Sequence, residues 1–266
     1  EVNAMWSSHC GWISPKEFVK AAIIETKQNL GKRFKMIFNS NLQLQQLKEY
    51  KFIDQKYSLK SFDSVVIATG FGSPNLINQK TLKKREQDKR FQKNDINEQG
   101  LTSNKPFLEL VNGQMTGIQI DCSNTINIKS VICKSGYLTP VINGFIYSGA
   151  SYETVKKPYD FTNVKNRTEN IKRLSNLICP KYFKTDFETQ LTFDRVSTRC
   201  VSKDKLPIVG LIMGGNQKIY ALTALGSRGL SWGPLAAENL AKEILLDGRI
   251  KKSIISKHIL PSRFKI

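Results

Sequence analysis

The sequence predicts a mixed α/β (α+β) fold, with α/β segments at both ends of the chain and antiparallel strands between them. Three observations predict it. Val65–Ala68 is a continuous run rich in β-branched residues, typical of a strand buried on both faces of a parallel sheet. Residues 106–152 hold short apolar runs broken by Gly, Asn and Pro, which indicate antiparallel strands. Tyr220–Leu225 is an apolar run that leads into a turn and then a helical pattern.

The turn in this last unit is bracketed by glycines at Gly226 and Gly229, and the helical pattern runs from about Trp232 to Leu246. Glycine lets the main chain approach a ligand closely. A helix N-terminus offers unpaired N–H groups and a partial positive charge. The unit is therefore either a seat for an electron-rich ligand atom or an ordinary strand–helix connection.

Capping signals place a helix near the start of the chain. Ser14 suits the N-cap, Pro15 suits the first helical position and Gly31 ends the helix. Its apolar face includes Phe18 and Ile23. We expect further strands at residues 34–38, 42–47, 50–57, 115–120, 130–133, 137–141, 145–150 and 187–199.

A second helix is expected at residues 161–177, with Ile171 and Leu174 inside and Asn170 and Arg173 outside. The Asn143-Gly144 pair predicts a hairpin turn. The charged stretch at residues 79–100 is expected to form an exposed helix with a loop.

The 266-residue chain has 41 basic and 22 acidic residues, which give a formal net charge of +19. Such an excess favours nucleic acid or an anionic membrane as a partner. The high content of Lys, Ile and Asn offers another explanation, a biased base composition. No apolar run is long enough to span a bilayer. We therefore expect no membrane-spanning segment, and we expect nucleic acid, not a membrane, as the anionic partner.

Cysteine and histidine usage points to a reducing, cytoplasmic setting. The five cysteines are odd in number and form no CxxC pair, and there are only two histidines, His9 and His258. This excludes a disulfide framework and predicts no metal site. The N-terminus shows no signal peptide. It starts at Glu1 and not at Met, so we expect a fragment or a processed product.

Three stretches, taken in order, resemble the FAD-dependent amine oxidases of the D-amino-acid oxidase and glycine oxidase type: Val65–Gly70, Arg199–Gly210 and Leu225–Pro234. The second has Arg, Asp, Pro and Gly at that group's spacing. A narrower set of motifs is similar to the oxidase half of the bifunctional tRNA 5-methylaminomethyl-2-thiouridine biosynthesis proteins. The motifs are GWISP, NGQMTG, SGYLTP, SGASY, STRCVSKDKLPIVG and ALGSRGLSWGPLAAE.

The resemblance implies an FAD-dependent oxidase that removes the carboxymethyl group of 5-carboxymethylaminomethyluridine at the tRNA wobble position. It implies FAD as cofactor, tRNA as partner and a fused methyltransferase domain elsewhere in a longer protein. Two alternatives stay open. One is an FAD oxidase acting on a small amino acid such as glycine or sarcosine. The other is an inactive, basic RNA-binding remnant of the fold.

The resemblance also implies roles for individual residues. Arg199 matches the arginine that grips the substrate carboxylate, since a guanidinium binds a carboxylate through two parallel hydrogen bonds. A structural ion pair with Asp194 is the alternative. Arg228 reaches the flavin or tRNA, or is a plain surface residue. Tyr137 lines the substrate side of the flavin, or is a core tyrosine. No catalytic base is expected, because the amine loses its proton to solvent.

Two segments match the cofactor-binding positions of that group, and main-chain N–H groups of the second would face the flavin pyrimidine edge. A backbone position further upstream matches one that meets the adenine. The implied cofactor-binding residues are Leu42, Ala68, Thr69, Gly70, Leu225, Gly226, Ser227, Arg228, Gly229, Leu230 and Ser231.

The sequence departs from the family in one feature. It contains no Gly-x-Gly-x-x-Gly turn of the kind that holds the FAD pyrophosphate in a βαβ unit. We therefore expect a partial, three-layer FAD-binding domain made of residues 1–100 and 201–266, with an antiparallel substrate domain at 101–200. The N-terminal FAD-binding segment is expected to be missing, so the chain alone should bind FAD poorly.

Overall fold

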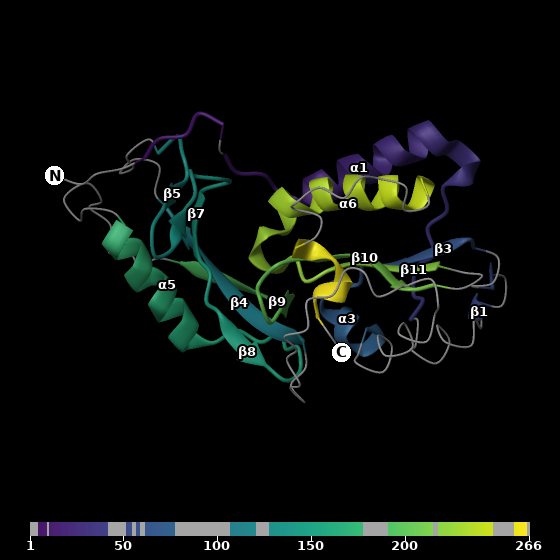
Figure 1. Ribbon diagram of the computed structural model, residues 1–266. Helices are drawn as coiled ribbons and strands as arrows, with labels where there is room; N and C mark the ends of the chain where they lie inside the picture. The colour runs from purple at the N-terminus through teal and green to yellow at the C-terminus, as the bar shows by residue number, and fades with distance from the viewer. Residues whose placement is uncertain are drawn as a thin grey trace. The chain divides into compact units, whose positions relative to one another are not determined.

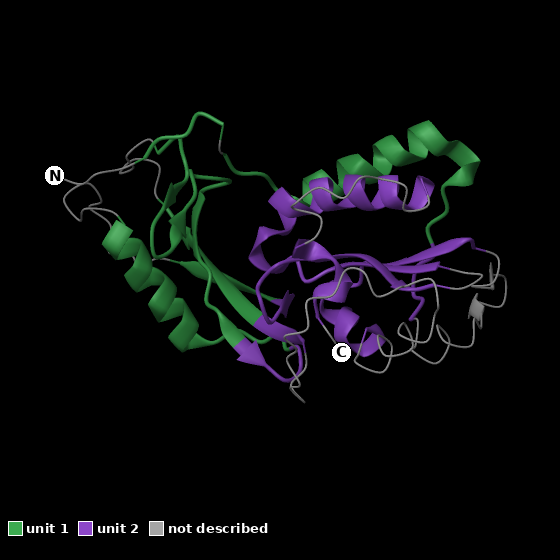
Figure 2. Ribbon diagram, in the orientation of Figure 1, with its two compact units in different colours: residues 1–36, 112–153, 159–197 green, residues 37–111, 154–158, 198–266 purple. Residues whose placement is uncertain are grey.

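The computed structural model describes residues 5–9, 11–41, 52–54, 57–58, 62–77, 107–120, 128–177, 191–214, 218–246 and 258–264. The chain forms two compact units, shown in different colours in Figure 2. Unit 1 comprises residues 1–36, 112–153 and 159–197, and unit 2 comprises residues 37–111, 154–158 and 198–266. The division into segments 1–100, 101–200 and 201–266 stays a prediction.

Unit 2 is built on a three-stranded sheet (Figure 1). Its central strand β11 (Lys218–Thr223) pairs antiparallel with β10 (Ile208–Met213) and parallel with β3 (Ser64–Ile67). Because β3 and β11 run in the same direction, their carboxyl ends lie at one edge of the sheet. In open α/β sheets, ligands bind at that edge.

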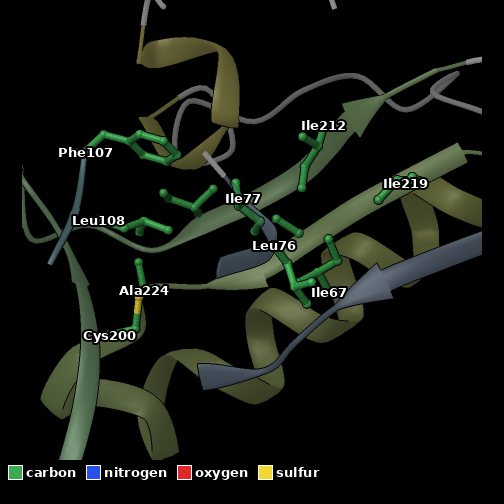
Figure 3. Packing of buried hydrophobic residues seen from close by; sticks show 11 residues of the cluster. Ile67, Leu76, Ile77, Phe107, Leu108, Cys200, Ile212, Ile219 and Ala224 are labelled. Atoms are coloured by element: carbon green, nitrogen blue, oxygen red, sulfur yellow. The ribbon is translucent and has the colours of Figure 1, made fainter. Parts of the chain in front are cut away.

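Two helices cover this sheet and make unit 2 a three-layer structure. The helix α6 (Gly229–Leu245) packs Ala236 and Leu240 against Val209 and Tyr220 on one face. On the other face, Figure 3 shows residues of the three strands gathered around the end of α3 (Ser73–Leu76). These buried side chains are Ile67, Leu76, Ile77, Ile212 and Ile219. The mixed α/β fold class is therefore confirmed.

One detail of this sheet was wrongly predicted. The Val65–Ala68 strand exists and is parallel to its neighbour, but it is not buried on both faces, since Val66 is 42% exposed. The reason is that β3 is an edge strand in the part of the chain that the structure describes, with β11 on one side only.

Unit 1 contains most of a six-stranded sheet. The strand order is β5-β6-β7-β4-β8, and β9 also pairs with β4. The helix α5 (Val164–Leu177) lies along one face of the sheet (Figure 1), where Ile171 and Leu174 pack against Leu138 and Ile146. The strands are β4 (Leu108–Gln119), β5 (Ile132–Cys133), β6 (Tyr137–Leu138), β7 (Phe145–Gly149), β8 (Glu153–Val155) and β9 (Thr192–Ser202).

Local turn signals in unit 1 were predicted correctly. Asn143 and Gly144 both have positive φ, 52° and 79°, and Ile142 and Phe145 bridge across the turn. This is the backbone of a tight hairpin. The prediction that Asn170 faces outward is wrong, because its side chain is fully buried against the sheet. A polar residue next to a helix's apolar stripe can turn inward where it finds hydrogen-bond partners.

The first helix, α1 (Pro15–Leu30), has the predicted bounds. Ser14 Oγ accepts a hydrogen bond from the Glu17 N–H at 3.4 Å, and Gly31 ends the helix with φ 53°. No residue of its apolar face is buried, and Phe18 is 39% exposed. The 3.6-residue period indicates a helix without indicating what covers it.

The remaining elements are short. Residues 34–38 form no strand, contrary to prediction. The segments β1 (Phe52–Asp54) and β2 (Tyr57–Ser58) form an antiparallel pair in the region predicted as one strand. The predicted elements at 42–47 and 79–100 lie outside the described residues. No described helix has the length and apolarity that a membrane crossing requires. Short 3-10 turns are η1 (Gly31–Arg33), η3 (Gly70–Gly72), η6 (Gly226–Arg228) and η7 (Pro261–Arg263).

Candidate functional site

Two tight turns lie at the carboxyl ends of the parallel strands β3 and β11. After β3 the chain bends at Gly70, whose φ is 54°. After β11 it bends at Ala224 and Gly226, with φ of 58° and 57°. Left-handed backbone suits glycine and strains alanine, so Ala224 is held there by its surroundings. The structure thus brings together the two glycine turns in which cofactor-binding residues were predicted.

A buried bridge of hydroxyl groups joins these two turns. Thr223 Oγ1 donates to Ser73 Oγ at 2.6 Å, and Ser73 Oγ lies 3.2 Å from Thr69 Oγ1. The Ser73 and Thr223 side chains are buried. No local pattern predicts this role of Ser73, because it depends on a contact between segments that are distant in the chain.

The thiol of Cys200 is buried beside the same bridge. Burial raises its pKa to about 11, and hydrogen bonds with Thr223 and the main chain of Ala224 counteract this only in part. Cys200 is therefore a neutral thiol at neutral pH, and it packs as a small apolar side chain. This excludes a thiolate role for Cys200 at the edge of the sheet.

The start of α6 has no capping side chain in the described part of the chain. The same holds for η6 before it. The side chains of Ser227, Arg228, Leu230 and Ser231 are exposed. A helix N-terminus carries partial positive charge on its free N–H groups. This arrangement fits the electron-rich pyrimidine edge of a flavin, which gains negative charge on reduction.

The end of β9 lies directly against this turn. Val201 bridges Leu225 in an antiparallel pair, and a Cβ on Gly226 would come within 3.2 Å of Val201 Cγ1. Glycine is required here for both its φ and its close packing. Arg199 precedes Val201 by two residues, so alternation along the strand gives both side chains the same direction.

Asp194 does not pair with Arg199. Its Oδ2 accepts a hydrogen bond from Arg167 Nε at 2.7 Å and forms an ion pair with Arg167 Nη2 at 2.6 Å, and its Oδ1 accepts a hydrogen bond from Thr116 Oγ1 at 2.8 Å. The Asp194 side chain is 1% exposed. The alternative of a structural ion pair between Arg199 and Asp194 is therefore wrong.

Arg199 itself is half-buried and makes no hydrogen bond or ion pair with any residue in the described part of the chain. A partly desolvated guanidinium gains most from a carboxylate that it can bind through two parallel hydrogen bonds. Its geometry therefore suits an incoming anionic group. The carboxylate-binding role stays a prediction.

The other predicted site residues differ in exposure and in the unit to which they belong. Ala68, Thr69 and Gly70 are exposed at the end of β3, and Arg228 is exposed in η6. Tyr137 is half-buried in β6 of unit 1, opposite Gly149. Leu42 lies outside the described residues. The roles of all of these residues remain predictions.

An ion pair near the C-terminus fixes the loop after β9. Asp204 accepts hydrogen bonds from Arg263 Nε and Nη2 at 2.6 and 3.0 Å, from Ser202 Oγ at 2.7 Å and from the Leu206 N–H at 3.1 Å. Partial burial would raise the pKa of Asp204, but these hydrogen bonds outweigh it and hold the pKa below its ordinary value. Sequence reasoning missed Arg263 as the partner of Asp204.

Residues 1–243 match the family described as FAD dependent oxidoreductase, and the chain belongs to that family. This agrees with the three-layer unit and with the uncapped helix start at the edge of its sheet. The oxidoreductase class and its FAD cofactor are thus shown at the level of the family.

More specific likenesses cover part of the chain. It is 30% identical over 179 residues to the tRNA 5-methylaminomethyl-2-thiouridine biosynthesis bifunctional protein MnmC of Vibrio vulnificus (strain CMCP6), covering 58% of this chain and 26% of that protein. The protein of the same name from Vibrio cholerae serotype O1 (strain ATCC 39541 / Classical Ogawa 395 / O395) is 33% identical over 178 residues, with the same shares covered. The chain thus spans about a quarter of the length of the curated relatives it matches.

Solved structures with some likeness are also oxidoreductases by name. Glycine oxidase from Bacillus cereus ATCC 14579 has a TM-score of 0.44 and 16% identity, covering 56% of this chain and 38% of its own. L-proline dehydrogenase from P. horikoshii has a TM-score of 0.47 and 20% identity, covering 59% of this chain and 40% of its own.

Proposed function

We propose that the chain is part of an FAD-dependent oxidase that removes the carboxymethyl group of 5-carboxymethylaminomethyluridine at the tRNA wobble position. The observation that carries the proposal is the half-buried Arg199, which has no partner among the described residues and comes two residues before Val201, the residue that bridges Leu225. The tRNA substrate is supported by the name of the relatives and by the net charge of +19. The setting that we propose is the cytoplasm.

The reacting group is in effect an N-substituted glycine, with a carboxylate one carbon away from a secondary amine. Arg199 binds the carboxylate through two hydrogen bonds, which fixes the carbon between carboxylate and amine. When bound, FAD supplies the two-electron oxidation of this carbon–nitrogen bond. Water then hydrolyses the resulting imine, which leaves the aminomethyl base and glyoxylate. The amine loses its proton to solvent before it is oxidised, so the chain supplies no base.

The residues around the two turns would hold the cofactor. Main-chain N–H groups from Gly226 to Ser231 would face the pyrimidine edge, and Ala68–Gly70 would lie along the dinucleotide. Arg228 would contact flavin or tRNA, and Tyr137 would line the substrate side. Since the sequence lacks a Gly-x-Gly-x-x-Gly turn, we propose that a segment beyond these 266 residues binds the pyrophosphate. A fused methyltransferase domain is part of the same proposal.

The test is Arg199→Ala in the FAD-loaded, longer protein, with tRNA carrying the modified wobble base as substrate. We expect the KM to rise by about 100-fold, because a charge-assisted, two-point hydrogen bond contributes about 3 kcal/mol. Arg199→Lys should restore part of this loss. Lys172→Ala, which removes an exposed positive charge from α5, is the control for general charge. An unchanged KM in Arg199→Ala contradicts the proposal.

The same arginine could bind the carboxylate of a small amino acid, and substrate turnover separates the two oxidases. Hydrogen peroxide released from glycine or sarcosine, with no change in tRNA nucleosides, identifies the small-molecule oxidase. Tight tRNA binding by a protein that holds no flavin and oxidises neither substrate identifies an RNA-binding remnant, which the positive net charge also suits.

A further inference from the structure

The face of the antiparallel sheet opposite α5 carries a cluster of three aromatic side chains. Phe193 of β9 meets Phe145 and Tyr147 of β7 edge to face, with ring centroids 5.7 and 5.9 Å apart and interplanar angles of 87° and 85°. Edge-to-face contacts fix the orientation of all three rings. We call these residues the aromatic cluster; all three belong to unit 1.

The direction of the aromatic cluster follows from strand alternation. Thr116 and Asp194 point toward α5, where Thr116 donates to Asp194 and Arg167 of α5 pairs with it. Their chain neighbours Gly117 and Phe193 therefore point to the opposite face. Tyr147 lies directly across from Gly117 in the β4–β7 register and shares that face.

The ring of Phe193 packs directly over the backbone of Gly117. A Cβ at Gly117 would come within 2.4 Å of Phe193 Cε1 and 2.7 Å of Cδ1. Only glycine lets the ring lie this close to the sheet. Even so, Phe193 remains 43% exposed. Gly117, Phe145 and Tyr147 thus fix the position of the Phe193 ring, and part of the ring stays exposed to solvent.

Positive charge lies next to the cluster on the same strand. Arg195 is exposed, alternates onto the same face as Phe193, and has no ion-pair partner within the described ranges.

We propose that the aromatic cluster is a stacking platform for an unpaired RNA base, and that Arg195 binds an adjoining phosphate. The proposal rests on the proposed tRNA substrate and adds where the RNA around the modified base is bound. Unpaired bases are recognised by stacking on aromatic rings, and basic side chains beside the rings follow the phosphates.

The experiment measures RNA binding by the 266-residue chain through fluorescence anisotropy. One probe is a labelled stem–loop RNA with the sequence of an anticodon loop, and the other is the same stem as a blunt duplex. Phe193→Leu removes the ring and keeps apolar bulk, and it should weaken stem–loop binding by about 10-fold, the effect of losing one stacked base. Phe193→Trp should bind as the wild type does. Arg195→Gln should lower the slope of log affinity against log salt by about one.

Phe161→Leu is the matched control, since Phe161 is an exposed aromatic residue of the same unit, stacked on Tyr159 at 4.3 Å. It should leave binding unchanged. Circular dichroism and thermal melting check that each variant folds. The proposal is overturned if Phe193→Leu binds the stem–loop as tightly as the wild type, if it weakens duplex binding equally, or if the wild-type chain does not bind the stem–loop. The binding measurement needs no flavin, so its result can be interpreted even if the protein shows no oxidase activity.

Discussion

The two faces of the antiparallel sheet in unit 1 are made by alternate residues of the same strands, yet charged side chains are ion-paired on one face and exposed on the other. On the face under α5, the Asp194 side chain is buried, accepts hydrogen bonds from Arg167 and Thr116, and forms an ion pair with Arg167. On the opposite face, Arg195 is exposed and has no counter-ion in the described part of the chain. The adjacent residues Asp194 and Arg195 of β9 thus differ, because the first is ion-paired and the second has no partner among the described residues.

The α5 face is also nearly complete in its hydrogen bonds. Asn170 Nδ2 donates to the Gln114 carbonyl at 2.9 Å and to Thr116 Oγ1 at 3.1 Å. Among the described residues, Asn170 Oδ1 is the one buried side-chain polar atom with no partner. Buried polar groups stabilise a fold only when they are satisfied. The comparison therefore predicts that substitutions on the α5 face lower stability more than substitutions on the opposite face, where we propose that RNA binds.

The largest expected effect comes from removing the buried carboxylate. Asp194→Ala leaves Arg167 without its partner and should lower the free energy of unfolding by about 3 kcal/mol or more, because a buried pair is broken on one side. Urea unfolding measures this, with Arg195→Ala as the control on the opposite face. The control should change stability by less than about 0.5 kcal/mol. Equal losses in the two variants would remove the distinction between the faces.

An intermediate loss of stability is expected from substitution of Gly117, which lies under the aromatic cluster. Gly117→Ala places a methyl group against the Phe193 ring and should cost about 1–3 kcal/mol as overpacking. Because Phe193 is partly exposed, its ring has room to shift, which favours the lower end. Phe193→Leu combined with Gly117→Ala should recover part of the loss, measured as a coupling energy in a double-mutant cycle. Additive losses would mean that the two residues are not in contact.

The smallest effect is expected at a more exposed aspartate, which tests whether burial sets the scale. Asp204→Asn weakens the pairing with Arg263 and should cost about 1 kcal/mol at neutral pH. The pKa of Asp204 is lowered in the folded state, so its contribution is full above the unfolded-state pKa of about 3.9 and is lost as the pH falls through the lower, folded pKa. The stability difference between wild type and variant should therefore shrink below about pH 4. A difference that stays constant to pH 2 would contradict this assignment.

Local signals in the sequence were sufficient for many element boundaries. Ser14, Pro15 and Gly31 set the ends of α1, and Asn143-Gly144 set the hairpin turn, because caps and turns depend on a few adjacent residues. The start of α6 was missed by one turn, since its first residues Gly229 and Leu230 continue the helix from η6 without any capping side chain.

Burial was harder to predict, because it depends on which distant segment covers a residue. The apolar residues of α1 and the outer face of Val66 are open to solvent, whereas the polar Asn170 is buried. For the candidate site, the motif around Arg199 was visible in the sequence. The packing of Phe193 over Gly117 was not, since it requires the register of two strands that are far apart in the chain.

The hydroxyl bridge through Ser73 has a mechanical consequence. Since one serine oxygen is shared by Thr69 and Thr223, the loops that follow β3 and β11 are coupled through a single buried atom. Displacement of either loop strains the hydrogen bond that anchors the other. The two loops are thus expected to move together when a ligand binds to either of them.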